Sequence, residues 1–224
     1  MQTLVTEHCE RTGENFRWTN YFDARQRGIS AVDRIFSNLQ EGMSEAEGQQ
    51  LVKEEFLKDG AEKFWHPSKF RIGADTVKTF RAAPEDSIRL QKGDILFVDV
   101  GPIFDGHEAD IGRTQIFGET SDESLKRLMS ASREVWMKTA NAWKTDNLSG
   151  EALYTFAGSL AEGRGYKLNP LMAGHRLGDF PHALFSKDKL SEMKFRPSEN
   201  LWVLEIHLID DSLARGSFYE DILS

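Results

Sequence analysis

The stretch that decides the fold runs from Asp94 to Thr114 and reads DILFVDVGPIFDGHEADIGRT. It begins with Ile95 to Val100, a compact run of β-prone residues. The Asp105-Gly106 dipeptide that follows favours a two-residue hairpin turn, because a type I′ turn needs positive φ at both central positions. The stretch therefore predicts a β-hairpin in which Phe104 pairs with His107.

Two carboxylates face the same side of this predicted hairpin. In the register that the turn sets, Gly101 lies opposite Asp110 and Asp99 lies opposite Gly112. Asp99 and Asp110 are then diagonal neighbours on one face, roughly 5 to 8 Å apart at Cβ. A single Asp in a strand more often has a structural role. Two carboxylates on one mostly buried face repel each other and lose hydration, and a bound cation is the simplest remedy.

The composition is that of an ordinary globular protein. The 224 residues are 39% hydrophobic and 29% charged, and the net charge of −8 argues against nucleic acid or an anionic membrane as the main partner. The only cysteine, Cys9, cannot form an internal disulfide or a thiolate metal cluster, which fits a reducing compartment. Residues 1–20 are polar and contain no apolar core of signal-peptide length. We expect one domain over residues 1–224, located in the cytoplasm.

Two similar helix pairs are predicted on either side of the hairpin. Apolar residues recur at helical spacing over residues 29–39 and again over residues 125–143. A second helix follows each time, capped by Ser44 within the capping box Ser-Glu-Ala-Glu and by Ser149 respectively. An offset of 105 residues aligns Ser44 with Ser149 and also aligns the helix-ending residues Gly60 and Gly165. This offset indicates a weak internal duplication of a helix–helix–strand unit.

The second half of the chain supplies further polar residues in apolar surroundings. The segment from Gly174 to His182 holds two histidines seven residues apart, and the strand-like run LWVLEIHL carries Glu205 and His207 on one face. Glu220 lies in a last predicted strand over residues 216–223. For each carboxylate, a salt bridge to one of the 28 Lys and Arg residues is the alternative. Bridging carboxylates with one imidazole would suit two divalent ions about 3.5 Å apart.

The order Asp, Asp, His, Glu, Glu resembles the pita-bread metallopeptidase superfamily, which includes methionine aminopeptidase, aminopeptidase P, prolidase and creatinase. The resemblance extends from the segment Glu41-Gly-Met-Ser-Glu to the terminal Tyr-Glu-Asp and covers the catalytic domain only. It implies an α+β fold in which two helix–helix–strand halves, related by a pseudo-twofold axis, surround a curved antiparallel sheet.

The resemblance also implies roles for individual residues. The implied metal ligands are Asp99 in VDVGP, Asp110 in DIGRT, His175 in GHRLG, Glu205 and Glu220. Glu205 is also the implied proton shuttle, and His182 matches a histidine that contacts the substrate. The fifteen residues that separate Glu205 from Glu220 are more similar to the prolidase and aminopeptidase P branch. A homodimer is a further expectation that the family implies.

Three features depart from the family pattern. Residues 73–80 contain no histidine, although relatives usually carry an additional active-site histidine there, and nothing in the sequence shows that His66 substitutes. Glu205-Ile-His replaces the usual Glu-Pro-Gly, and His182 is followed by Ala-Leu-Phe instead of an acidic residue. Because His207 shares a strand face with Glu205, we expect it to contact the substrate or orient Glu205. A histidine that is hydrogen-bonded within the core is the alternative.

The resemblance implies a dinuclear metal-dependent hydrolase of peptidase type, most similar to an Xaa-Pro aminopeptidase or dipeptidase. A metal-bridging hydroxide would attack the amide carbonyl of a small peptide or small-molecule amide. The two divalent ions could be Mn, Co, Fe or Zn, because the predicted ligands are oxygen and nitrogen only. Two alternatives stay open. One is a non-peptidase, creatinase-like C–N hydrolase or lyase on the same fold, and the other is a non-catalytic pita-bread binding module.

Overall fold

The computed structural model describes residues 8–79, 81–83, 85 and 87–224. The four helices that build the fold are α2 (Trp18–Ser37), α3 (Glu45–Lys58), α4 (Glu123–Asp146) and α5 (Gly150–Glu162). Short 3-10 turns are η1 (Gly73–Val77), η2 (His182–Leu184) and η3 (Leu190–Glu192). The strands are β1 (Lys63–Phe64), β2 (Lys69–Ile72), β3 (Ile95–Val100), β4 (Pro102–Phe104), β5 (His107–Glu108), β6 (Ile111–Ile116), β7 (Lys167–Leu168), β8 (His175–Arg176), β9 (Trp202–Asp210) and β10 (Arg215–Ile222).

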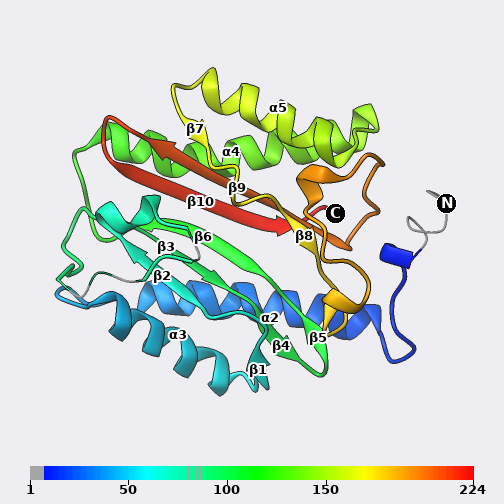
Figure 1. Cartoon of the computed structure of the whole chain (residues 1–224). Coiled ribbons are helices and arrows are strands. Elements are labelled where there is room, and N and C mark those ends of the chain that lie inside the picture. The colour runs from blue at the N-terminus through cyan, green and yellow to red at the C-terminus, as the bar shows by residue number, and fades with distance from the viewer. Residues whose placement is uncertain (1–7, 80, 84, 86) are drawn as a thin grey trace.

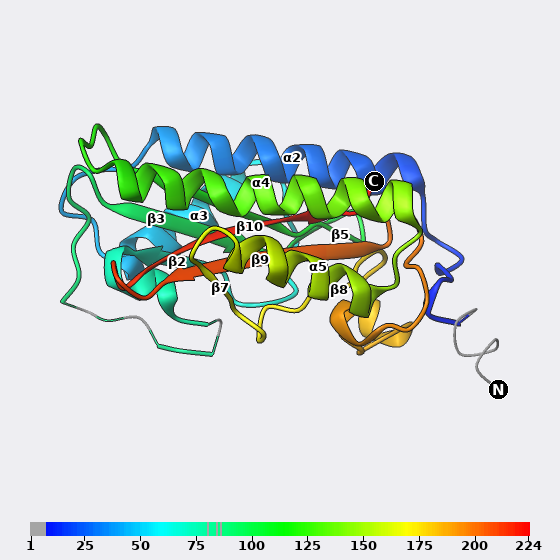
Figure 2. The same cartoon turned by 90° about the horizontal axis from the view of Figure 1, so that it is seen from above.

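The strands form two antiparallel sheets. The larger sheet has the order β2-β3-β6-β10-β9-β7, with β8 paired to β9, and the smaller one has the order β1-β4-β5. Figure 1 shows the helix pair α2 and α3 along the half of the large sheet that contains β2 and β3, and the pair α4 and α5 along the half that contains β9 and β10. In Figure 2, α2 and α4 run side by side over the same region of the sheet. The α+β fold class predicted from the sequence is confirmed.

The central hairpin has the predicted turn and register. Asp105 and Gly106 have φ values of 49° and 71°, as a type I′ turn requires. Phe104 pairs with His107, and the same register continues to the pair of Asp99 and Gly112. One turn dipeptide therefore sets which residues face each other over both strands.

The two predicted helix caps are present in corresponding places. The Ser44 side chain accepts a hydrogen bond from the N–H of Glu47 at the start of α3, and the Ser149 side chain accepts one from the N–H of Ala152 at the start of α5. Each helix pair also covers its own apolar core. Phe56 and Val98 lie in the core below α2 and α3, whereas the core below α4 and α5 contains other residues, including Trp143, Leu204 and Ile206. Among the described residues, no helix has both the length and the apolar character needed to cross a membrane.

Candidate metal centre

A row of polar residues crosses the large sheet on the face opposite the helices. Asp99 on β3 pairs with Gly112 on β6, Gly112 pairs with Glu220 on β10, and Glu220 pairs with Glu205 on β9. Lys69 on β2 extends the row beyond Asp99. Directly paired residues point to the same side of a sheet, so the three carboxylates converge over the side-chain-free position of Gly112.

Two glycines make room for this cluster. A Cβ atom at Gly112 would approach ring carbon Cε1 of Phe218 to 2.4 Å and the Cγ of Glu220 to 3.0 Å. A Cβ atom at Gly101 would lie 2.2 Å from Nε1 of Trp65 and 2.4 Å from Cδ2 of His66. Gly101 is also the residue at which the hairpin passes from the large sheet to the small one. Its missing side chain allows the segment after β1 to lie against the carboxylates.

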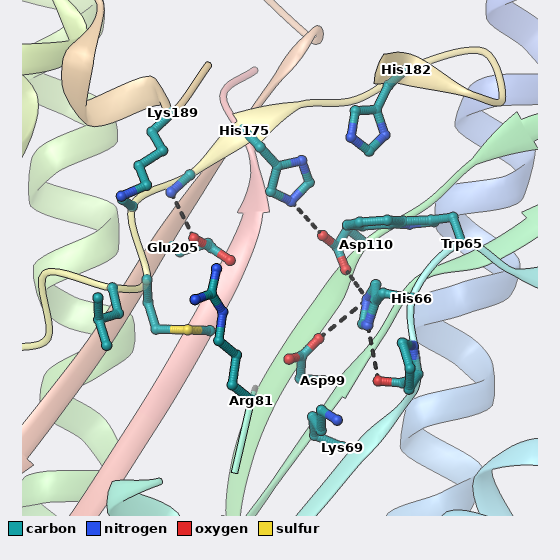
Figure 3. A pocket seen from close by; sticks show the side chains of 15 residues that line it. Trp65, His66, Lys69, Arg81, Asp99, Asp110, His175, His182, Lys189 and Glu205 are labelled. Carbon is teal, nitrogen blue, oxygen red and sulfur yellow. Dashed lines mark hydrogen bonds and ion pairs between the residues drawn. The ribbon is translucent and has the colours of Figure 1, made fainter. Parts of the chain in front are cut away.

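Two histidines contact the aspartates, each through its own Nε2 atom. Nε2 of His175 lies 2.8 Å from Oδ2 of Asp110, and Nε2 of His66 lies 3.3 Å from Oδ1 of Asp110 and 3.4 Å from Oδ1 of Asp99 (Figure 3). In both rings Nδ1 lies within hydrogen-bond distance of the carbonyl oxygen of the next residue, at 2.7 Å for His175 and 3.1 Å for His66. A histidine held at Nδ1 by a carbonyl presents Nε2 as a metal ligand.

Burial and mutual repulsion raise the pKa values of three carboxyl groups in the cluster. Burial raises the pKa of Asp99 to about 7, and the nearby negative charges of Asp110 and Glu205 act in the same direction. Burial likewise raises the pKa of Glu205 and holds that of Glu220 well above its ordinary value. Asp110 differs, because hydrogen bonds from His175 and His66 outweigh burial and lower its pKa.

The histidine pKa values shift in the complementary direction. Burial lowers the pKa of His66 and His175, but the charges of Asp99 and Asp110 and the hydrogen bonds to Asp110 outweigh it and raise both values to about 9. With these pKa values, both imidazoles are protonated at neutral pH, and their protons lie between the rings and the carboxylates. A divalent cation would satisfy the same groups without these protons.

The donor set of the cluster fits divalent cations. Among the described residues, one ligand atom each from His66, Asp99 and Asp110 lies within 4.8 Å of the others. Glu220 Oε1 is buried and accepts no hydrogen bond from the described part of the chain. An unpaired buried carboxylate oxygen costs free energy unless a cation or a proton satisfies it. Oxygen and imidazole ligands without thiolate suit Mn, Fe, Co or Zn.

A cavity of about 530 Å³ opens directly above the cluster. Its wall includes Asp99, Asp110, His175, His182 and Glu205, which the sequence had indicated. Apolar and cationic residues complete the lining. Those labelled in Figure 3 are Trp65, His66, Lys69, Arg81 and Lys189, and the others are Pro67, Leu171, Met172, Ala173 and Gly174. Glu220 is 1% exposed and pairs with Glu205, so it belongs to the floor of the cluster.

His207 shares a strand face with Glu205, as predicted, but it lies outside the lining of this cavity. Its ring is 1% exposed, Nδ1 accepts a hydrogen bond from Asn169 Nδ2 at 3.0 Å, and Nε2 donates to the Thr76 carbonyl at 2.8 Å. Burial lowers its pKa to about 4. Both ring nitrogens are therefore used within the core. The predicted contact of His207 with the substrate is corrected to a structural role, because β9 carries it one row away from the carboxylates and next to Phe218.

The sequence did not assign a role to Trp65 and His66. The Trp65 ring contacts three imidazoles, with centroid distances of 4.3 Å to His66, 5.0 Å to His175 and 4.9 Å to His182. Gly101 was the available signal, because a glycine inside a strand often marks a close approach of another segment. The expected additional histidine is absent from residues 73–79, and Phe80 lies outside the described residues.

Two helix pairs packed on an antiparallel sheet, with four carboxylates and imidazoles on its open face, are the features of the pita-bread fold. The chain belongs to metallopeptidase family M24, whose family model matches residues 21–213.

Solved structures agree with this assignment. X-Pro aminopeptidase from Thermotoga maritima superposes with a TM-score of 0.81 at 19% identity and covers 100% of this chain. Prolidase from Pyrococcus furiosus gives a TM-score of 0.78 at 18% identity over 99% of this chain. This chain spans only 64% of each of those two proteins. Methionine aminopeptidase from Thermotoga maritima gives 0.72 at 17% identity, over 96% of this chain and 98% of that one. At these identities the similarity establishes the fold.

One curated relative matches part of the sequence. Methionine aminopeptidase 1B, chloroplastic, from Arabidopsis thaliana is 34% identical over 98 residues, which is 44% of this chain and 26% of the relative. The match supports the family and, because it is partial, says nothing about the substrate of this protein.

Proposed function

We propose that this protein is a dinuclear metal-dependent hydrolase that cleaves an amide bond in a short peptide or a small-molecule amide. The observation that carries the proposal is the convergence of Asp99, Asp110, Glu205 and Glu220 with the Nε2 atom of His175 at the floor of one cavity. A cluster with that many buried acids is electrostatically costly without cations. Two bound ions would offset its charge.

Six residues would hold the ions in this proposal. Asp110 would contribute both carboxylate oxygens, which already face two different imidazoles. Asp99, Glu220, His175 and Glu205 would supply further ligands, and His66 Nε2 would be an additional nitrogen ligand. When bound, a pair of divalent ions supplies Lewis acidity and lowers the pKa of water towards neutrality.

The protein's own groups would position the substrate and move the protons. Glu205 Oε2 accepts a hydrogen bond from the Gly174 N–H at 2.6 Å, which fixes its carboxylate beside the cavity. We assign Glu205 to take a proton from the attacking water and deliver it to the leaving nitrogen. His182 lines the same cavity and would hydrogen-bond the substrate there.

The cavity wall favours a substrate with a carboxylate. Its cations are Lys69, Arg81 and Lys189, and the only carboxylates in the described lining are the three proposed ligands Asp99, Asp110 and Glu205. Metal ions would neutralise those acids and leave the cations to attract an anionic group. An Xaa-Pro dipeptide fits this requirement, and relatives of similar fold are an X-Pro aminopeptidase and a prolidase.

A second function on the same site is supported by specific departures. Ile206 and His207 follow Glu205 in place of Pro-Gly, and residues 73–79 carry no histidine. These changes favour a non-peptidase C–N hydrolase or lyase acting on a small anionic amide. A non-catalytic binding module is disfavoured, since every predicted ligand position is filled. The cytoplasmic location and the homodimer stay predictions.

Metal analysis followed by a substrate screen tests the proposal. Protein purified without chelators should contain about two divalent ions per chain, measured by elemental analysis. It should hydrolyse Xaa-Pro dipeptides or other carboxylate-bearing amides when Mn, Co, Fe or Zn is added. His182→Ala should keep the metal and lose turnover by about 100-fold, whereas the surface variant Asp23→Ala should match the wild type. Absence of bound metal in the wild type would overturn the proposal.

A further inference from the structure

A buried glutamate binds His182 on the side of its ring that faces away from the cavity. Glu108 on β5 is 0% exposed, and its Oε2 lies 2.7 Å from Nδ1 of His182. Its other oxygen, Oε1, accepts a hydrogen bond from the backbone N–H of His182 at 3.1 Å. One carboxylate thus binds the ring and the main chain of the same residue. Nothing in the proposed reaction so far uses Glu108.

The segment that carries His182 depends on this hairpin for its position. The Glu108 N–H donates to the Gly178 carbonyl at 2.8 Å, and the Phe180 N–H donates to the Gly106 carbonyl at 3.0 Å. His107 and Asp179 form an isolated β-bridge between the same two segments. Leu184, two residues beyond His182, is 69% exposed. The tip of the hairpin therefore anchors a segment that is otherwise largely at the surface.

The opposite edge of the His182 ring faces the cavity. The ring stacks on His175 with centroids 5.3 Å apart and meets Trp65 edge-on at 4.9 Å. Within the described part of the chain, Nε2 of His182 has no hydrogen-bond partner, and the residue lines the cavity. Figure 3 shows its ring beside that of His175, above Asp110. Nε2 is the atom left for a substrate.

Two carboxylate–histidine pairs thus stand side by side. Asp110 and Glu108 are two residues apart on the same stretch of the hairpin, and they contact His175 and His182 respectively. The Asp110 pair borders the cavity and belongs to the proposed metal centre. The Glu108 pair differs, because its carboxylate is outside the cavity lining and, among the described side chains, hydrogen-bonds only that of His182. The two carboxylates would therefore have different roles: Asp110 would bind metal, whereas Glu108 would act on His182.

We infer that Glu108 is a positioning residue that fixes the tautomer and orientation of His182. An ionised carboxylate only accepts hydrogen bonds, so Nδ1 of His182 must carry the proton that lies between them. Nε2 is then held at one place in the cavity wall, aimed at the substrate. A histidine kept in one tautomer by a buried acid is a recurrent way to prepare the other nitrogen for a reaction.

The tautomer of His182 gives a test that does not depend on activity. In the zinc-loaded full-length chain, two-bond ¹H–¹⁵N correlation spectra should show His182 protonated at Nδ1, with its signals identified by their loss in His182→Gln. In Glu108→Gln, a substantial fraction should convert to the Nε2-protonated form, because an amide NH₂ can donate to Nδ1. A wild-type ring protonated at Nε2 alone, or an unchanged tautomer in Glu108→Gln, would overturn the inference.

Steady-state kinetics give a second test of the role of Glu108, and this test rests on the proposed amide hydrolysis. Glu108→Gln should lower kcat about 10-fold to 100-fold, as loss of a carboxylate that orients a functional histidine does, with metal content and KM nearly unchanged. Glu108→Asp should recover part of kcat, since the carboxylate is retained. Glu45→Gln is the matched control: Glu45 is buried and binds Arg71 and the Ile72 N–H away from the cavity, so it should lower stability but not kcat.

The possible failures are distinguishable. If Glu108→Gln loses metal in parallel with activity, Glu108 supports the metal centre and the inference is wrong. If no amide is hydrolysed by any metal form, the proposed function fails, and the tautomer spectra still decide the role of Glu108. Should Glu108→Gln fail to fold, the spectrum of the wild type and the Glu108→Asp variant carry the test.

Discussion

The metal-free protein should lose stability as the pH rises from about 5 to about 7. The cause is Asp99, whose pKa burial raises from 3.8 to about 7. In this range the folded protein keeps a proton on Asp99 that the unfolded chain has released. Stability falls with rising pH wherever the folded state binds more protons than the unfolded state. The contribution of Asp99 is therefore fully present below pH 3.8 and is lost as the pH rises through about 7.

The expected size follows from the two pKa values. Linkage with values of 3.8 and about 7 gives a loss of about 2 kcal/mol in the free energy of unfolding between pH 5 and pH 7. Between pH 7 and pH 9, His66 and His175 should lower stability further. Their folded pKa values of about 9 exceed the ordinary 6.5, so their contribution is present below 6.5 and lost through 9. The raised pKa values of Glu205 and Glu220 act in the same direction as Asp99.

Urea unfolding of chelator-stripped protein at several pH values would measure this dependence. Asp99→Asn should remove about 2 kcal/mol of the change between pH 5 and pH 7, because an amide does not titrate there. Added divalent ions should reverse the trend, since metal binding replaces the protons and tightens as they leave. Equal pH dependence in stripped wild type and Asp99→Asn would refute the reasoning.

Three further substitutions test the centre and its surroundings. Asp110→Ala should remove most bound divalent metal in elemental analysis, because this carboxylate would contribute both of its oxygens to the centre; metal content equal to that of the wild type would contradict its role as a ligand. His66→Ala should weaken metal affinity about 10-fold to 100-fold by calorimetry, and an unchanged affinity would leave His66 as a cavity-wall residue only. His207→Ala should lower the free energy of unfolding by about 3 kcal/mol, through a cavity and two lost hydrogen bonds, while metal content stays constant; a normal unfolding curve with reduced kcat/KM would restore the substrate contact.

The local elements of this protein could be predicted from short stretches of sequence. The Asp105-Gly106 dipeptide sets the hairpin register, because only a few residues can adopt positive φ twice in succession. That register alone places Asp99 opposite Gly112. Ser44 and Ser149 likewise mark two helix starts, since each side chain bonds an N–H only three residues away. These interactions span a few residues and need no tertiary contact.

The proposed ligand set could also be predicted, for a different reason. Charged residues inside apolar strands are rare, so Glu205 and Glu220 stood out against their neighbours before their partners were known. Period-two alternation then predicted which of them share a face. The sequence could not show that β9 and β10 pair in the register that brings Glu205 opposite Glu220.

Only the tertiary structure decided what surrounds the centre. His66 reaches Asp110 across 44 residues, and Glu108 reaches His182 across 74. His207 follows the same alternation as Glu205, yet its ring nitrogens bond Asn169 and Thr76, which come from other segments. Periodicity along a strand says which side a residue faces. It does not say which distant segment is packed there, because that depends on how the helices and loops close over the sheet.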